Sequence, residues 1–172
     1  MMQTIKIAGI FLVLILVIGC GGAGIHGNAP KTYDTVKEMT TDIKAGVQRI
    51  SIDEFKALFE SDEMFLLIDI RGQAEFDAGS IDGAIHIARG QLEFKIGNEQ
   101  FWDSEGMFVP EKDELIIVYG EMIDRGAYAA ETLNRFGYKD AKYIHGGWTA
   151  WLHGPDAIVE EEVVVEESGC GN

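Results

Sequence analysis

Two short apolar runs stand out in the pattern of hydrophobic and polar positions along the chain. Residues 65–69 (FLLID) and 115–119 (LIIVY) are apolar almost throughout. Such runs are typical of strands that are buried on both faces of a parallel sheet. Residues 48–50, 84–87 and 141–144 are shorter strand candidates that lie close to glycines.

Segments with helical periodicity alternate with these strands. Ser51 begins one of them, and Glu54 follows three residues later, which is the capping-box pattern of a helix N-terminus. Further helices are predicted over residues 32–45, 125–136 and 148–152. This alternation predicts an α/β fold, with a parallel central sheet of about five strands and helices on both faces.

The first twenty residues combine one positive charge with an apolar run. Residues 7–19 carry no charged or polar side chain and lie between Lys6 and Cys20. Thirteen such residues are too few to span a bilayer comfortably, and the layout is that of a signal peptide. Residues 17–20 (VIGC) resemble the lipobox of bacterial lipoproteins. The resemblance implies cleavage before Cys20 and lipid attachment to its thiol. The alternative is an uncleaved signal anchor over residues 5–24.

These features divide the chain into four predicted parts. The parts are a lipoprotein signal peptide over residues 1–19, a glycine-rich tether over 20–30, a folded domain over 31–154 and an acidic tail over 155–172. The lipobox places the folded domain in a bacterial cell envelope, lipid-anchored on the periplasmic or outer-surface side.

The charge balance limits the classes of partner. The chain has 14 Lys and Arg against 29 Asp and Glu, a formal net charge of −15. Nucleic-acid binding requires a basic surface, so a nucleic-acid partner is not expected. Two cysteines and four scattered histidines form no metal-ligand spacing, and the sequence predicts neither a metal nor another cofactor.

Four motifs, in order along the chain, resemble those of the rhodanese-like domain. They are Asp69-Ile70-Arg71 at the end of a buried strand, residues 79–87 (GSIDGAIHI), residues 89–94 (RGQLEF) and residues 146–151 (GGWTAW). The resemblance spans residues 48–154. It implies the rhodanese-like α/β fold and, in active members, transfer of a sulfane sulfur through a cysteine persulfide.

The loop after the strand at 115–119 departs from the family pattern. Active members have Cys-x-x-Gly-x-Arg-Ser there, and the cysteine is the nucleophile. In this chain the segment consists of Gly120, Glu121, Met122, Ile123, Asp124, Arg125 and Gly126. The arginine spacing is kept, but glycine stands at the nucleophile position and has no side chain to carry sulfur. We therefore predict that this loop is a vestigial active site with no catalytic residue.

The charge of the same loop bears on which ligands it accepts. Glu121 and Asp124 add two negative charges against the single cation Arg125. Repulsion from the two carboxylates would weaken the binding of an anion such as thiosulfate. The alternative is that both carboxylates point outward, with Asp124 favouring only the helix N-terminus.

Other candidate residues are assigned structural roles. Asp69 and Arg71 are expected to hold loops at the carboxyl edge of the sheet rather than to act in catalysis. His86 and His145 lie at strand ends as isolated histidines, with no ligand role predicted. A separate pair, Trp148 and Trp151, has helical spacing and is expected to pack against the sheet.

Cys170 is the free thiol that remains if Cys20 is lipidated. The sixteen residues from Gly154 to Cys170 could extend ~50 Å, far enough to reach the loop at Gly120. The acidic surroundings of Cys170 should raise the pKa of its thiol and reduce its reactivity.

The sequence thus predicts a membrane-tethered, catalytically inactive rhodanese-like module that acts as a binding or accessory protein in the envelope, with a partner protein, an envelope complex or a small ligand as its target and an envelope protein favoured. The alternative is a sulfurtransferase or sulfane-sulfur carrier that uses Cys170 or a thiol of a partner.

Overall fold

The computed structural model describes residues 31–158. The chain divides into two units, Met1–Thr32 and Tyr33–Asn172, and all elements below belong to the second unit. The predicted signal peptide, the tether, Cys20 and Cys170 lie outside the described residues. Among the residues from 31 to 158, no helix is long and apolar enough to cross a membrane.

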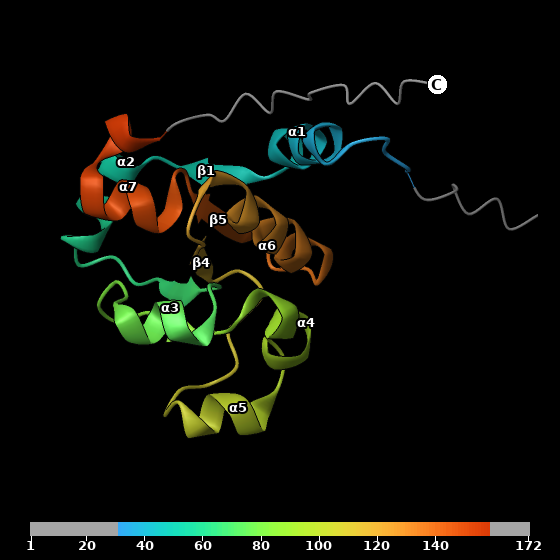
Figure 1. The fold of residues 1–172 in the computed structure, drawn as a ribbon. Helices are drawn as coiled ribbons and strands as arrows, with labels where there is room; N and C mark the ends of the chain where they lie inside the picture. Colours follow the sequence, from blue (N-terminus) through green and yellow to red (C-terminus); the bar gives the residue numbers. More distant parts are fainter. Residues whose placement is uncertain (1–30, 159–172) are drawn as a thin grey trace, which may run out of the picture. The chain divides into compact units, whose positions relative to one another are not determined.

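Helices and strands alternate along the described chain (Figure 1). The elements are α1 (Val36–Gly46), β1 (Gln48–Ile50), α2 (Ile52–Phe59), β2 (Leu66–Asp69), α3 (Gln73–Ala78), β3 (Ile85–His86), the 3₁₀ turn η1 (Arg89–Gln91), α4 (Leu92–Lys95), α5 (Glu99–Ser104), β4 (Leu115–Tyr119), α6 (Ile123–Arg135), β5 (Asp140–Ile144), α7 (Gly147–His153) and the 3₁₀ turn η2 (Pro155–Ala157). The five strands form one parallel sheet in the order β1-β5-β4-β2-β3. The predicted α/β fold with five parallel strands is confirmed.

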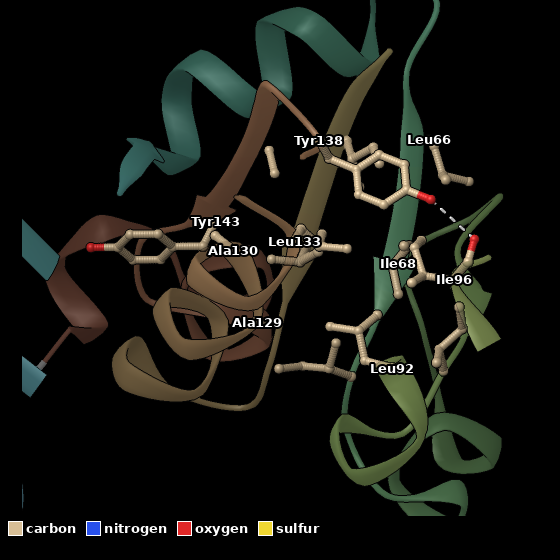
Figure 2. Packing of buried hydrophobic residues seen from close by; sticks show 14 of the residues in the cluster. Leu66, Ile68, Leu92, Ile96, Ala129, Ala130, Leu133, Tyr138 and Tyr143 are labelled. Carbon is tan, nitrogen blue, oxygen red and sulfur yellow. Dashed lines mark hydrogen bonds between the residues drawn. The ribbon is translucent and has the colours of Figure 1, made fainter. Parts of the chain in front are cut away.

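Alternate residues of the central strands pack on opposite faces of the sheet. Ile68 and Val118 belong to a core cluster with residues of α4, α5 and α6, which cover one face. Figure 2 shows this cluster, in which Leu92 of α4 and Leu133 of α6 lie near Ile68. Tyr119 belongs to a second cluster with residues of α2 and α7 on the other face. Both faces are therefore covered by helices, as predicted.

Local capping explains where two of the helices begin. Ser51 accepts a hydrogen bond from the Glu54 amide, and the Glu54 carboxylate accepts one from the Ser51 amide, so the predicted capping box is present. The first helix begins at Val36 rather than at residue 32, because Thr35 has extended backbone and its side chain caps the Glu38 amide.

Other differences from the predicted elements concern the third strand, three short helices and the end of the folded domain. The third strand covers Ile85–His86 rather than residues 84–87, since the Ala84 amide is bonded to Ile81 in a turn. The short helices α3, α4 and α5 were not predicted. Folded structure also continues past residue 154, because Ile158 packs against the same cluster as α2 and α7.

Candidate functional site

The carboxyl ends of β2 and β4 lie side by side and bring the predicted site residues together. Asp69 ends β2 and is paired in register with Tyr119, which ends β4. Arg71 follows the first strand by two residues and Gly120 follows the second directly. In parallel α/β sheets this edge is the usual place for ligands.

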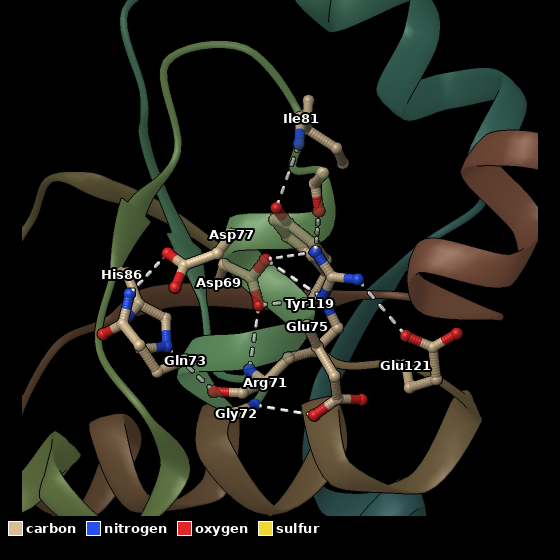
Figure 3. A network of polar contacts seen from close by, with 11 residues as sticks. Asp69, Arg71, Gly72, Gln73, Glu75, Asp77, Ile81, His86, Tyr119 and Glu121 are labelled. Carbon is tan, nitrogen blue, oxygen red and sulfur yellow. Dashed lines mark hydrogen bonds and ion pairs between the residues drawn. The ribbon is translucent and has the colours of Figure 1, made fainter.

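Asp69 and Arg71 form a buried ion pair at this edge (Figure 3). The Arg71 Nη2 atom lies 2.7 Å from Asp69 Oδ2, Nε lies 3.0 Å from the same oxygen, and Nη2 also donates to the Gly79 carbonyl at 2.6 Å. The side chain of Arg71 is only 2% exposed and that of Asp69 is 0% exposed. Burial alone lowers the pKa of Arg71, but the hydrogen bonds and charge of Asp69, with a further bond to Glu121, raise that pKa above its usual value. The guanidinium therefore stays charged and fixed.

Aromatic rings enclose the Arg71 guanidinium. Its central carbon lies 4.3 Å from the ring centroid of Trp148 and 5.6 Å from that of Tyr119, which are cation–π distances. The Tyr119 hydroxyl accepts a hydrogen bond from the Ile81 amide at 3.1 Å. Burial, reinforced by the Asp69 carboxylate, raises the pKa of Tyr119 far above its ordinary value, so the phenol stays protonated.

The backbone of the loop after β4 is bonded to the start of α7. The Gly120 carbonyl accepts from the Trp148 amide at 2.8 Å, and the Glu121 carbonyl accepts from the amide and hydroxyl of Thr149 at 3.2 and 3.0 Å. Gly147 makes this approach possible: a Cβ there would lie 2.2 Å from the Gly120 oxygen. The carbonyls of the loop thus hold it against the first residues of α7.

The position predicted as the vestigial nucleophile is closely packed. A Cβ added to Gly120 would lie 3.0 Å from Arg125 Cβ, closer than the usual separation of about 3.5–4.0 Å between carbons. Gly126 is buried, and a Cβ there would lie 3.1 Å from Tyr143 Cβ, so this glycine lets α6 approach β5. The segment fits residues without side chains at both positions.

The charged side chains of the loop have different environments. Glu121 reaches Arg71, with its Oε2 atom 3.3 Å from Nη1. Arg125 and Met122 are exposed. For Ile123 and Asp124 the structure describes the backbone, which forms the start of α6, and the predicted effect of Asp124 on anions stays a prediction.

The isolated histidines and the tryptophan pair lie beside the site or in the core. His86 Nε2 lies 2.9 Å from the Arg71 carbonyl, and its ring stacks on Phe76 at 4.8 Å. The backbone amide of His145 donates to the Ile50 carbonyl. Trp148 stacks on Arg71, and Trp151 packs against aromatic residues of α2. Within the described residues, 31–158, no group of three His, Cys, Asp or Glu could hold a metal ion.

Comparison with known proteins agrees with this architecture. A sequence model of the rhodanese-like domain matches residues 51–153, more than half of the chain. The chain belongs to the rhodanese-like domain family.

Relatives with names or solved structures cover most of the rhodanese-like domain. Human thiosulfate:glutathione sulfurtransferase is 30% identical over 112 residues, which are 63% of this chain and 96% of the relative. The structure of a human single-domain sulfurtransferase superposes with a TM-score of 0.57 and 27% identity, over 62% of this chain and 96% of the other. A protein of unknown function from Rhodopseudomonas palustris, described as a possible tyrosine phosphatase, superposes with a TM-score of 0.60 and 27% identity, over 72% and 94% of the two chains.

Two contacts of the rhodanese-like site were not predicted from the sequence. The pair between Arg71 and Glu121 joins residues 50 positions apart, and the bonds from α7 to the loop join residues 28 positions apart. Nothing in the local pattern signals either one. Motif order could only indicate that both segments end near the same sheet edge.

Proposed function

We propose that this chain is a catalytically inactive rhodanese-like module that works by binding another protein in a bacterial cell envelope, where a lipid on Cys20 tethers it. The observation that carries the proposal is the glycine, Gly120, directly after β4. The family resemblance assigns the nucleophilic cysteine to this position. Between residues 31 and 158 the chain has no cysteine at all.

Sulfur transfer of the rhodanese type depends on that missing side chain. A thiolate attacks the outer sulfur of thiosulfate, the S–S bond breaks, and sulfite leaves with the electron pair. Cyanide then attacks the outer sulfur of the resulting persulfide, which releases thiocyanate and restores the thiolate. Glycine can carry out neither step, because it cannot hold the transferred sulfur.

The packing of the loop fits glycine at position 120. The approach of Arg125 Cβ would have to be relieved before a side chain could fit at Gly120. In addition, the carbonyls of Gly120 and Glu121 are bound to α7. These hydrogen bonds fix the backbone of the loop, which supports a role for this edge of the sheet as a rigid binding surface.

A thiosulfate:cyanide assay on the full chain tests the absence of catalysis. We expect no thiocyanate above the uncatalysed rate, in the unmodified chain and in Cys170→Ser alike. Turnover that Cys170→Ser abolishes would refute the proposal and establish the tail thiol as nucleophile. Turnover that survives in Cys170→Ser would refute it as well, with another group as sulfur acceptor.

The alternative function is sulfur transfer or carriage through Cys170 or a partner's thiol. The observation that favours it is the sulfurtransferase name of the human relative. To distinguish a partner's thiol, the assay is repeated with glutathione as an added small thiol. We expect no stimulation over glutathione without the protein, and stimulation would favour the alternative.

The tether is tested by the mass of the mature amino terminus. We expect a chain that begins at Cys20 and carries the added mass of the lipid. A chain that begins with unmodified Met1 would contradict the lipoprotein assignment. Capture of one envelope protein by the lipidated chain, lost when the loop is altered by Met122→Asp, would support the binding role. Unchanged capture by this variant would place binding elsewhere and refute the role of this edge.

A further inference from the structure

One contact at the candidate site serves neither the sheet nor the helices. The Glu121 carboxylate reaches from the loop after β4 to Arg71, which follows β2, and its Oε2 atom lies 3.3 Å from Nη1 (Figure 3). Arg71 is 2% exposed, whereas Glu121 is 41% exposed. A solvent-accessible carboxylate is therefore bound to a buried cation.

The other donors of Arg71 are already engaged. Its Nε and Nη2 atoms bind both oxygens of Asp69, and Nη2 also binds the Gly79 carbonyl. Trp148 and Tyr119 lie within cation–π distance of the guanidinium. Nη1 is the guanidinium nitrogen that faces the loop, and Glu121 occupies this direction.

Glu121 has a different role at Arg71 from that of Asp69. The fully buried Asp69 already neutralises Arg71, as a buried cation requires. Glu121 is a second carboxylate on the same cation, on the solvent side. It presents to Nη1 what a sulfur oxyanion would present: a negatively charged oxygen at hydrogen-bond distance.

We infer that Glu121 is a built-in ligand of Arg71 that excludes sulfur oxyanions, such as sulfate and thiosulfate, from the rhodanese-like site. The loop holds Glu121 beside Arg71, because its carbonyl is bonded to the amide and hydroxyl of Thr149. A tethered carboxylate competes at a high effective concentration, which a free anion must exceed. The inference rests on the proposed function, since it identifies which ligands the inactive site refuses.

Sulfate titration of the full chain tests this exclusion without any turnover. Sulfate has no sulfane sulfur to donate, so the result does not depend on whether the chain is an enzyme. Binding is followed through the NMR signals of the Arg71 Nε–H and of the Trp148 indole that stacks on it. Three variants are compared with the unmodified chain: Glu121→Ala, Glu121→Gln and the matched control Glu93→Ala.

Glu93 is a suitable control because it also forms an ion pair with an arginine, Arg89, at 2.7 Å, and lies in α4 rather than in the loop after β4. Removing either carboxylate changes the net charge of this acidic chain by the same amount. We expect Glu121→Ala to lower the dissociation constant of sulfate at least about tenfold. Added sodium chloride should weaken this binding of sulfate, because salt screens the attraction between the anion and Arg71. Glu121→Gln should bind with an intermediate affinity, because its amide oxygen keeps a neutral acceptor near Nη1. Glu93→Ala should match the unmodified chain.

Equal sulfate affinity in Glu121→Ala and the unmodified chain would overturn the inference. An equal gain in Glu93→Ala would do so too, because the effect would then be one of net charge alone. If Glu121→Ala does not fold, Glu121→Gln decides by the same comparison. Thiocyanate formation by the unmodified chain would refute the proposed function, whereas the sulfate comparison alone decides the role of Glu121.

Discussion

Gly147 offers a sharp test of how the loop is held against α7. Its backbone φ is +52°, and an added Cβ would lie 2.2 Å from the Gly120 carbonyl oxygen. The same oxygen accepts the Trp148 amide at 2.8 Å. Alanine at this position must therefore push α7 away from the loop and weaken this hydrogen bond.

The magnitude follows from separating backbone strain from the steric overlap. Gly137 has φ of +89° with nothing within 4 Å of its added Cβ, so Gly137→Ala measures the backbone strain alone. The left-handed conformation costs an L residue about 1–2 kcal/mol. Overpacking adds about 1–3 kcal/mol, and a weakened hydrogen bond about 1 kcal/mol. We expect Gly147→Ala to lower the free energy of unfolding by about 3–6 kcal/mol.

Guanidinium denaturation of the full chain, followed by tryptophan fluorescence and circular dichroism, measures both variants. Gly147→Ala should move the midpoint to lower denaturant by at least twice the shift seen for Gly137→Ala, since it carries additional costs. Equal shifts in the two variants would refute the close approach of α7 to the loop.

Two further predictions concern the ion pair and the capping box. Asp69→Ala leaves Arg71 buried without its main counter-ion and should lower the free energy of unfolding by about 3–5 kcal/mol. The same denaturation experiment measures this change, and a loss below about 1 kcal/mol would contradict a buried ion pair. The hydrogen bonds from the side chain and backbone of Ser51 lower the pKa of Glu54 from its usual 4.5, so their stabilising contribution is present above that pH and is lost as the pH falls through the lowered pKa. In Ser51→Ala, NMR titration should therefore find the Glu54 pKa closer to 4.5, and an unchanged pKa would argue against the capping box.

Strands β2 and β4 could be predicted from the sequence, because their burial requires apolar residues at successive positions. A strand that is covered on both faces must be apolar at successive positions, and residues 65–68 and 115–118 are. Ser51 and Glu54 likewise predicted the start of a helix, because a capping box involves residues only three positions apart. The short helix α5 escaped prediction, since its buried Trp102 becomes a core residue only when the sheet is in place.

In the candidate site, too, some features followed from the sequence and others only from the tertiary structure. The lack of a sulfur-bearing side chain at Gly120 was evident from the residue type and motif spacing, which are properties of the sequence. Strand order, the contact of Arg71 with Glu121 and the bonds from α7 to the loop required the tertiary structure. The physical reason is that pattern and capping act over a few residues, whereas these contacts join segments that only the packing of the sheet brings together.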